Sequence, residues 1–376
     1  MNVAIDLTAL LPLHSGVDNY LKQLVWHLGR VDRSNTCTVF LNFADRRLFD
    51  GILPLNFSVR PVCWRPHLRR WLFQQGALPA AAKALSVDVV HSPSFLMAIY
   101  RGSQRHLVTV YDMTFFSLPE CHTALRRSWL FTWMVLSSIR RAHMVTVPSR
   151  STKTEILRLM SDVSSDKIRV VRAGISDEFT PATTETMRTE LARLGLPWPY
   201  ILFVGSIEPR KNLRRLLESY RRLIASGDRD EHLVLAGRPG WDYGDVLAQL
   251  ASPDLRGKAH LFGVRQHDLP WLYRGASLFV YPSLQEGFGF PPLEAMACGV
   301  PTIASRSTSL TENLEGAAEL MPPEDVDALG AAMRRLLSDA ALRAQRTRDG
   351  MARAARFRWE ETARQTLSCY QDLAAR

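Results

Sequence analysis

The sequence predicts an α/β protein that consists of two Rossmann-like domains in tandem. The chain of 376 residues is too long to fold around one ordinary hydrophobic core. Short β-branched apolar runs alternate with longer amphipathic stretches, which is the pattern of a parallel sheet flanked by helices. The alternation loosens over residues 180–199, which contain Pro and Thr, and then begins again. We therefore expect two doubly wound sheets with a ligand-binding cleft at the carboxyl ends of their strands.

The predicted strands divide evenly between the two halves of the chain. In the first half they cover residues 2–7, 36–42, 87–91, 106–110 and 143–147. In the second half they cover residues 200–204, 232–236, 259–262, 277–281 and 300–304. Helical spacing over residues 357–375 predicts a C-terminal helix.

Composition narrows the classes of protein to consider. The 5 cysteines are scattered and form no CxxC pair, which argues against a disulfide framework or a zinc site. We find neither a secretory signal nor an apolar run of spanning length, and we expect a cytoplasmic protein. Residues 1–184 hold 22 of the 47 Lys and Arg residues but 13 of the 37 Asp and Glu residues. This basic half suits an anionic partner such as a lipid surface, a pyrophosphate-linked acceptor or nucleic acid, although solubility alone would also explain it.

Two common nucleotide-binding motifs are missing from the sequence. It contains neither a GxGxxG fingerprint nor a GxxxxGK[ST] loop. A classical NAD enzyme and a P-loop ATPase are therefore disfavoured. A bound nucleotide would need another set of contacts.

Residues 286–301, EGFGFPPLEAMACGVP, are the most informative stretch. They follow an apolar strand and combine a glycine loop with Pro291 and Pro292, which suit the start of a helix, and with Glu294, expected in its first turn. A glycine loop at a helix N-terminus is a ready anion site. Glu286 and Glu294 could contact different hydroxyls of one ligand. Alternatively, Glu294 complements the helix dipole and Glu286 is a solvated loop residue.

A second cluster lies at residues 205–212, GSIEPRKN, between a predicted strand and a predicted helix. Arg210 and Lys211 should therefore reach the same sheet edge as the glutamate loop. Two adjacent cations can neutralise a diphosphate, with Arg binding two oxygens and Lys acting as a point charge. A solvated basic loop is the alternative.

Together these stretches resemble glycosyltransferase family 4 of the GT-B superfamily, whose pattern includes GxxxxRKN and EGFGxPxLEAMACGxP. LAGRPGW at residues 235–241 supports the resemblance. It implies two Rossmann-like domains that face each other across a cleft, with the C-terminal helix crossing back to the first. The N-terminal acceptor domain would cover residues 1–180 and 358–376, and the C-terminal donor domain residues 181–357.

The resemblance also implies roles for individual residues. Glu286 would contact the donor sugar, Glu294 the ribose, and Arg210 and Lys211 the diphosphate. Other donor-binding positions would be Gly16, Gly205, Gly287, Phe288 and Gly289, and the residues near the reacting sugar or the acceptor would be His91, Tyr111 and Asp112. We include Asp112 with Glu286, Arg210 and Lys211 among the candidate catalytic residues. Tyr111 stands where many relatives carry histidine, which suggests a 6-deoxyhexose donor.

The implied reaction is a hexosyl transfer with retention at the anomeric carbon, without a cofactor or a required divalent metal. We favour GDP-mannose or a related GDP-hexose as donor, a glycan or lipid-linked acceptor, and a role in cell-surface polysaccharide synthesis. A UDP-hexose donor and a GT-B-shaped sugar-nucleotide epimerase are the alternatives. A binding module for acidic polymers is a further alternative. The basic residues are accompanied by no RNP, zinc or helix-turn-helix signature, so we expect no nucleic acid partner.

Residues 124–142, ALRRSWLFTWMVLSSIRRA, contain an aromatic centre between two arginine pairs. Such a helix could rest on an anionic membrane surface, with its arginines at the headgroups. An ordinary amphipathic helix packed on the sheet is the alternative. The membrane interpretation would place the protein at the inner face of the membrane.

Overall fold

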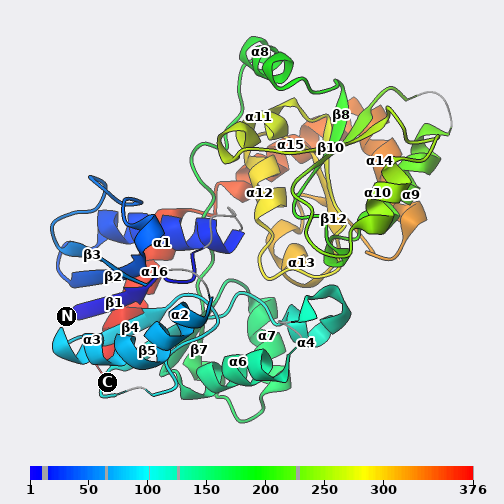
Figure 1. Cartoon of the computed structure of the whole chain (residues 1–376). Helices are drawn as coiled ribbons and strands as arrows, with labels where there is room; N and C mark the ends of the chain where they lie inside the picture. Colours follow the sequence, from blue (N-terminus) through cyan, green and yellow to red (C-terminus); the bar gives the residue numbers. More distant parts are fainter. Residues whose placement is uncertain (11–15, 64–66, 101, 125–127, 226–228, 376) are drawn as a thin grey trace. The chain divides into compact units, whose positions relative to one another are not determined.

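The computed structural model describes residues 1–10, 16–63, 67–100, 102–124, 128–225 and 229–375, which form two compact units (Figure 1). The first unit comprises Met1–Ser117, Ala124–Gly174 and Arg358–Arg376, and the second comprises Leu118–Thr123 and Ile175–Phe357. Each unit contains one parallel sheet with helices. The predicted α/β fold with two Rossmann-like domains is therefore confirmed.

The first unit has a seven-stranded sheet in the order β3-β2-β1-β4-β5-β6-β7. Its strands are β1 (Asn2–Asp6), β2 (Thr36–Asn42), β3 (Phe57–Cys63), β4 (Val89–Ser92), β5 (Arg105–Thr109), β6 (Met144–Val147) and β7 (Ile168–Val170). Its helices are α1 (Gly16–Val31), α2 (His67–Leu72), α3 (Leu78–Ala84), α4 (Thr114–Ser117), α6 (Trp129–Arg141), α7 (Arg150–Leu159) and α16 (Trp359–Ala374).

The second unit has a six-stranded sheet in the order β10-β9-β8-β11-β12-β13. Its strands are β8 (Tyr200–Val204), β9 (His232–Ala236), β10 (Ala259–Phe262), β11 (Leu278–Tyr281), β12 (Thr302–Ser305) and β13 (Glu319–Met321). Its helices are α8 (Thr184–Leu194), α9 (Leu213–Ile224), α10 (Gly244–Leu250), α11 (Leu269–Gly275), α12 (Phe290–Ala297), α13 (Thr308–Leu314), α14 (Val326–Ser338) and α15 (Ala340–Ala354). The central strands β8 and β11 are neighbours, so the loops that follow them emerge side by side.

Three strands were missed by the sequence analysis, and all three lie at sheet edges. β3 and β7 are the two edges of the first sheet, and β13 is an edge of the second. β3 contains Arg60 and Pro61, which are tolerated at an edge because one side of the strand has no ladder partner. β7 and β13 have only 3 residues each. Edge strands lack the long apolar runs that make central parallel strands recognisable.

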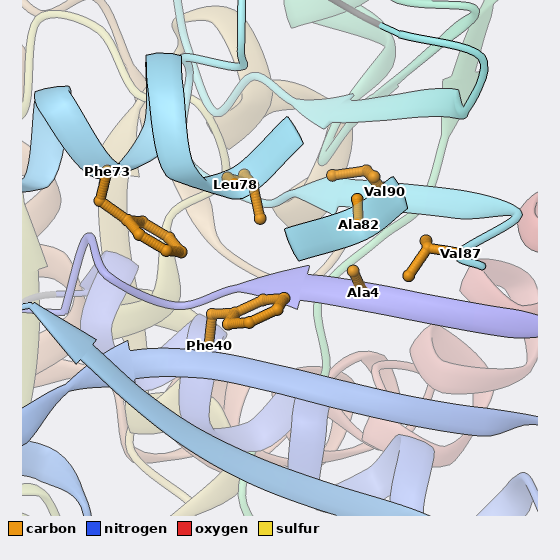
Figure 2. Packing of buried hydrophobic residues seen from close by; sticks show 7 residues of the cluster. All are labelled: Ala4, Phe40, Phe73, Leu78, Ala82, Val87 and Val90. Carbon is orange, nitrogen blue, oxygen red and sulfur yellow. The ribbon is translucent and has the colours of Figure 1, made fainter. Parts of the chain in front are cut away.

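The core of the first unit includes a cluster that joins the sheet to a helical layer (Figure 2). Ala4 on β1, Phe40 on β2 and Val90 on β4 face Leu78 and Ala82 on α3. Phe73 from the short helical turn before α3 and Val87 from the turn after it complete the cluster. Burial of such side chains stabilises the fold by about 25 cal/mol per Å² of apolar surface.

The C-terminal helix α16 belongs to the first unit, where it lies beside α1 (Figure 1). Trp359 is buried at its start and packs edge-on against Tyr20 of α1, with 5.5 Å between the ring centroids. Gly174 allows this arrangement, because a Cβ atom there would lie 2.2 Å from the backbone nitrogen of Trp359. The expected return of the C-terminal helix to the first domain is thus confirmed.

Candidate functional site

The loop after β8 carries the predicted cations and is held along the loop after β9. The backbone N–H of Gly205 donates to the carbonyl of Ala236 at 3.0 Å, and that of Ile207 donates to Arg238 at 3.0 Å. Gly237 is required by this close approach, because a Cβ atom there would lie 1.8 Å from the carbonyl oxygen of Gly205. The LAGRPGW stretch therefore supports the loop that bears the cations.

Arg210 and Lys211 lie in a short 3-10 turn, Pro209–Lys211, directly before α9. Asn212 ends the turn in the left-handed region at φ 59°, which Asn tolerates better than most residues. Its side-chain amide donates to the carbonyls of Pro282 at 3.0 Å and Pro323 at 2.7 Å. The Asn of the RKN motif thus ties the loop after β8 to the loop after β11.

Both cations contact the carboxylate of Glu286 from the neighbouring loop. Lys211 Nζ lies 2.6 Å from Glu286 Oε1, and Arg210 Nη1 lies 2.8 Å from Glu286 Oε2. Tyr281 accepts a hydrogen bond from Lys211 at 2.7 Å and donates to Glu286 at 3.1 Å, while Ser283 donates to Glu286 at 2.6 Å. The expectation that residues 205–212 and 286–301 meet at one sheet edge is confirmed by these contacts.

This environment keeps Glu286 ionised. Burial alone would raise the pKa of Glu286, but Arg210 and Lys211 overcome it and lower the pKa to about 2. Burial and Arg210 lower the pKa of Lys211, and Glu286 opposes them. Within the cluster Glu286 can only accept hydrogen bonds, so it suits hydroxyl groups of a ligand.

The backbone of Glu286 is fixed by α13. Thr308 accepts from the N–H of Glu286 at 3.1 Å and donates to its carbonyl at 3.0 Å, and Ser309 donates to the same carbonyl at 2.8 Å. Thr308 has φ 37°, a strained conformation for a β-branched residue. Such strain persists where surrounding contacts hold the residue, and here they hold the glutamate loop.

The glycine loop leads into α12 as expected, but Glu294 lies just beyond the first turn of the helix, in which it was predicted. Gly289 precedes the helix at φ 92°, and a Cβ atom there would lie 2.6 Å from Leu310. The helix begins at Phe290, so Glu294 is its fifth residue, outside the first turn. The backbone of Phe288 is fixed by Asn313, whose amide donates to its carbonyl at 2.8 Å.

Glu294 is a buried acid that accepts a hydrogen bond from a phenol. Tyr273 of α11 donates to Glu294 Oε2 at 2.8 Å. Burial raises the pKa of Glu294 to about 7; the Tyr273 bond opposes the rise and Glu178 adds to it. Glu294 therefore titrates near neutral pH, unlike Glu286.

The candidate residues of the first unit have structural contacts of their own. His91 is buried, and its ring nitrogens lie 2.7 Å from the Tyr370 hydroxyl and 2.9 Å from that of Thr109. Burial lowers its pKa to about 3, so the ring is neutral. Tyr111 is also buried and donates to the carbonyl of Pro93 at 2.5 Å. These contacts account for both side chains within the fold, and their predicted proximity to the sugar stays a prediction.

The remaining first-unit candidates lie at helix starts. The Asp112 carboxylate accepts from the N–H of Thr114 at 3.1 Å and from its hydroxyl at 2.7 Å, at the start of α4. Gly16 is the first residue of α1, and residues 11–15, which precede it, lie outside the described residues. Within the described residues, no group of three or more His, Cys, Asp and Glu side chains could hold a metal ion.

Several residues that contact Arg210, Lys211, Glu286 or Glu294 were not singled out from the sequence. They are Glu208, Tyr273, Tyr281, Ser283, Thr308 and Ser309. Glu208 lies inside the GSIEPRKN stretch, and Tyr281 and Ser283 follow the strand before Glu286, so the residues next to each motif were the available signal. Tyr273 and Thr308 lie far from the motifs in sequence, and only the fold brings them near.

Helix α6 exposes large aromatic side chains on one face. Trp129 is 77% exposed and Trp133, one turn later, is 50% exposed. Arg140 and Arg141 at its end are also exposed, whereas Arg126 and Arg127 lie outside the described residues. Across the part of the chain that the structure describes, no helix is both long and apolar enough to cross a membrane.

Comparison with known proteins places this geometry in a family. The family description Glycosyltransferase Family 4 matches residues 14–179, and the description Glycosyl transferases group 1 matches residues 198–339. Sucrose-phosphate synthase from Thermosynechococcus elongatus has a similar structure, with a TM-score of 0.79 at 21% identity over 100% of this chain and 99% of that one. At this identity the similarity shows the fold.

Curated relatives extend the match in sequence. The O-antigen chain mannosyltransferase B of Escherichia coli is 35% identical over 286 residues, which are 75% of this chain and 74% of that protein. The serotype-specific mannosyltransferase WbdA of Escherichia coli is 31% identical over 233 residues, or 61% of this chain, and the match spans 28% of that longer protein. The chain therefore belongs to glycosyltransferase family 4 and is a glycosyltransferase with the GT-B fold.

Proposed function

We propose that this glycosyltransferase transfers mannose, or a related hexose, from a GDP-sugar to a glycan or lipid-linked acceptor with retention at the anomeric carbon. The observation that carries the proposal is the cluster of Arg210, Lys211 and Glu286 at the ends of β8 and β11. The choice of mannose and of cell-surface polysaccharide synthesis is supported by the relatives, which are named as mannosyltransferases and one as an O-antigen chain enzyme.

In this proposal Arg210 and Lys211 stabilise the departing nucleoside diphosphate. Cleavage of the glycosyl phosphate bond develops negative charge on the phosphate oxygens. Both cations are already held in place by Glu286, Tyr281 and the loop backbone, so little reorganisation is needed during the reaction. Preorganised charge of this kind is often the largest single contribution to enzymatic rate.

Glu286 is proposed to orient the donor sugar rather than to attack its anomeric carbon. Its lowered pKa, near 2, reflects a carboxylate that is already stabilised by two cations and by hydroxyl donors. A carboxylate stabilised in this way is a weak nucleophile, because attack would have to give up those contacts. Its oxygens remain suited to accept hydrogen bonds from sugar hydroxyls. Glu294 is proposed to accept hydrogen bonds from the ribose hydroxyls in the same way.

The proposed reaction needs no divalent metal, because the two cations supply the positive charge beside the diphosphate. Treatment of the protein with EDTA should leave the rate of transfer unchanged. A loss of activity that returns on addition of Mg²⁺ or Mn²⁺ would contradict this part of the proposal.

The donor and reaction class are tested together by product analysis. The protein is incubated with GDP-mannose, UDP-glucose or a GDP-6-deoxyhexose, each with and without a mannose-terminated glycan acceptor. We expect mannose transfer that depends on the acceptor, and an α-linkage in the product from the α-linked donor. An epimerised nucleotide sugar formed without acceptor would favour the epimerase instead. Preference for the 6-deoxy donor would support the sugar subsite suggested by Tyr111.

We also propose that the first unit contacts an anionic membrane through α6, where a lipid-linked acceptor would be found. Exposed Trp side chains beside basic residues are typical of helices at a membrane interface. Replacing Trp129 and Trp133 by Ser should reduce co-sedimentation with vesicles that contain anionic lipid. Trp198→Ser is the matched control, because that side chain is 54% exposed but lies in the second unit. Equal recovery of all variants would contradict the membrane contact.

A further inference from the structure

We infer that Glu208 is a positioning residue that holds the Arg210 guanidinium at the diphosphate. The inference rests on the proposed function, because it takes a nucleoside diphosphate as the ligand of Arg210. Glu208 lies in the same loop as Arg210, two residues before it, and its side chain is only 4% exposed. Nothing in the motif pattern assigns it a role.

The Arg210 guanidinium contacts two carboxylates, those of Glu208 and Glu286. Nη2 donates to Glu208 Oε1 at 2.8 Å, whereas Nη1 lies 2.8 Å from Glu286 Oε2 and donates to the carbonyl of Gln285 at 2.9 Å. The other oxygen of Glu208 accepts from the Ser206 hydroxyl at 2.8 Å. Glu208 is therefore itself fixed at both oxygens, and it fixes one end of the guanidinium.

The two carboxylates should behave differently when donor binds. Glu286 is proposed to share its oxygens between the two cations and the sugar hydroxyls, which weakens its contact with Arg210. Glu208 is on the same short loop as Arg210, and the backbone N–H of Lys211 donates to its carbonyl at 3.0 Å, so the loop closes on itself. Glu208 can therefore keep the guanidinium in place while Glu286 also binds the sugar.

Simple electrostatics predicts the opposite effect of removing Glu208. Glu208, Arg210, Lys211 and Glu286 together carry no net charge when all are ionised. Replacing Glu208 by Gln would leave an excess positive charge, which alone should strengthen the binding of an anionic ligand. If Glu208 acts by positioning, the same variant should weaken binding, because the neutral amide oxygen of Gln holds Arg210 less firmly than a carboxylate does. The sign of the change separates the two explanations.

The experiment measures the binding of GDP by calorimetry, with UDP, ADP and inorganic pyrophosphate as further probes. We expect Glu208→Gln to raise the Kd of the tightest probe by about 10-fold, since a hydrogen bond between charged partners becomes one to a neutral acceptor. Glu208→Asp, which keeps the charge, should be intermediate. In an Arg210→Ala background Glu208→Gln should change the Kd less than about twofold, because coupled residues do not add.

Glu319→Gln is the matched control. Glu319 in the same unit pairs with Arg335 and Arg346 and lies on the edge strand β13. This variant should leave nucleotide binding unchanged, and thermal unfolding checks that each protein is folded. Unchanged or tighter binding by Glu208→Gln, or an effect that persists in the Arg210→Ala background, would overturn the positioning role alone. A wild-type protein that binds none of the probes would overturn the proposed function as well.

Discussion

Glu286 and Glu294 are carboxylates on one short segment of chain, the first largely and the second fully enclosed by the fold, yet their ionisation differs. The pKa of Glu286 is lowered to about 2, whereas that of Glu294 is raised to about 7. Burial acts on both in the same direction, since it disfavours the charged form. The difference comes from their partners: Glu286 contacts two cations, and Glu294 accepts from the phenol of Tyr273.

This contrast shows how one motif can hold two acids for different tasks. A carboxylate that stays ionised at every physiological pH can serve as a fixed hydrogen-bond acceptor beside the proposed diphosphate site. A carboxylate that titrates near pH 7 binds hydroxyl groups best once it has lost its proton. The two residues should therefore respond differently to mutation and to pH, and each response can be measured.

The largest effect on kcat is expected when one of the two cations that contact Glu286 is removed. Lys211→Ala removes a buried positive charge that is proposed to stabilise the leaving diphosphate. We expect kcat to fall by on the order of 10² to 10³, as for the loss of another preorganised donor of this kind. Initial rates at saturating donor measure the change, and Arg210→Ala should behave similarly.

Lys211→Leu is a useful companion variant, because it fills part of the same volume without the charge. Both variants need a thermal unfolding curve, since Glu286 would lose one buried partner. Full kcat in a folded Lys211→Ala protein would refute the leaving-group role. If Glu286→Ala were at the same time inactive and a sugar were found covalently attached to Glu286 in wild type, a nucleophilic mechanism would have to replace it.

A smaller effect is expected for Glu286→Ala. Its carboxylate is proposed to orient the sugar, which affects both donor binding and the approach to the transition state. We therefore expect a raised donor KM together with a kcat reduced by about 10- to 100-fold. Because the pKa of Glu286 is far below neutrality, the ratio of wild-type to Glu286→Gln activity should stay constant between pH 6 and 7, where loss of the Glu286 charge has the least effect on the ionisation of Lys211. A ratio that changes across this range would contradict the conclusion that Glu286 stays ionised.

The sequence and the structure agree best where local pattern and topology carry the same information. Central parallel strands are long apolar runs, and the loops after β8 and β11 meet because adjacent parallel strands end at one edge. The pairing of Arg210 and Lys211 with Glu286 could be anticipated from this rule, because each loop follows a recognisable strand.

Other features depend on contacts that no local pattern reveals. Tyr273 reaches Glu294 from α11, and Thr308 reaches the backbone of Glu286 from α13. The buried ring of His91 contacts Tyr370, which lies 279 positions away on α16. The edge strands β3, β7 and β13 were not predicted from the sequence, because their residues are few or polar.

The role proposed for Glu294 is tested by the pH dependence of the donor KM. If only ionised Glu294 accepts the ribose hydroxyls, the wild-type donor KM should fall by about tenfold between pH 6 and 8 as the competent fraction rises. Glu294→Gln should have a raised KM that no longer changes across this range, with kcat nearly unaffected. KM profiles of equal slope for both proteins would contradict the role of Glu294.

Stability provides an independent measurement of the same ionisation. The folded pKa of Glu294 lies near 7, above the ordinary value of 4.5, so folding favours the protonated acid. The associated stability is present below pH 4.5 and is lost as the pH rises through 7. Wild type should therefore lose free energy of unfolding between pH 4.5 and 8 in a way that Glu294→Gln does not. Over this range the free energy of unfolding of the variant relative to wild type should increase by on the order of 3 kcal/mol. Urea unfolding of both proteins at several pH values measures this difference.

The smallest effect is expected for Tyr273→Phe, which removes the one hydrogen bond that opposes the raised pKa of Glu294. The pKa should rise further, so the fall in donor KM should begin at higher pH, and KM at pH 7 should increase by about two- to threefold. The aromatic ring would keep its packing against Phe279, 5.5 Å away, so stability should drop by only about 1 kcal/mol. Tyr220→Phe is the matched control, because that buried phenol donates to backbone carbonyls instead. Tyr273→Phe and wild type should have equal KM at pH 9, where Glu294 is ionised in both; an equal increase at every pH would mean that Tyr273 contacts the donor itself.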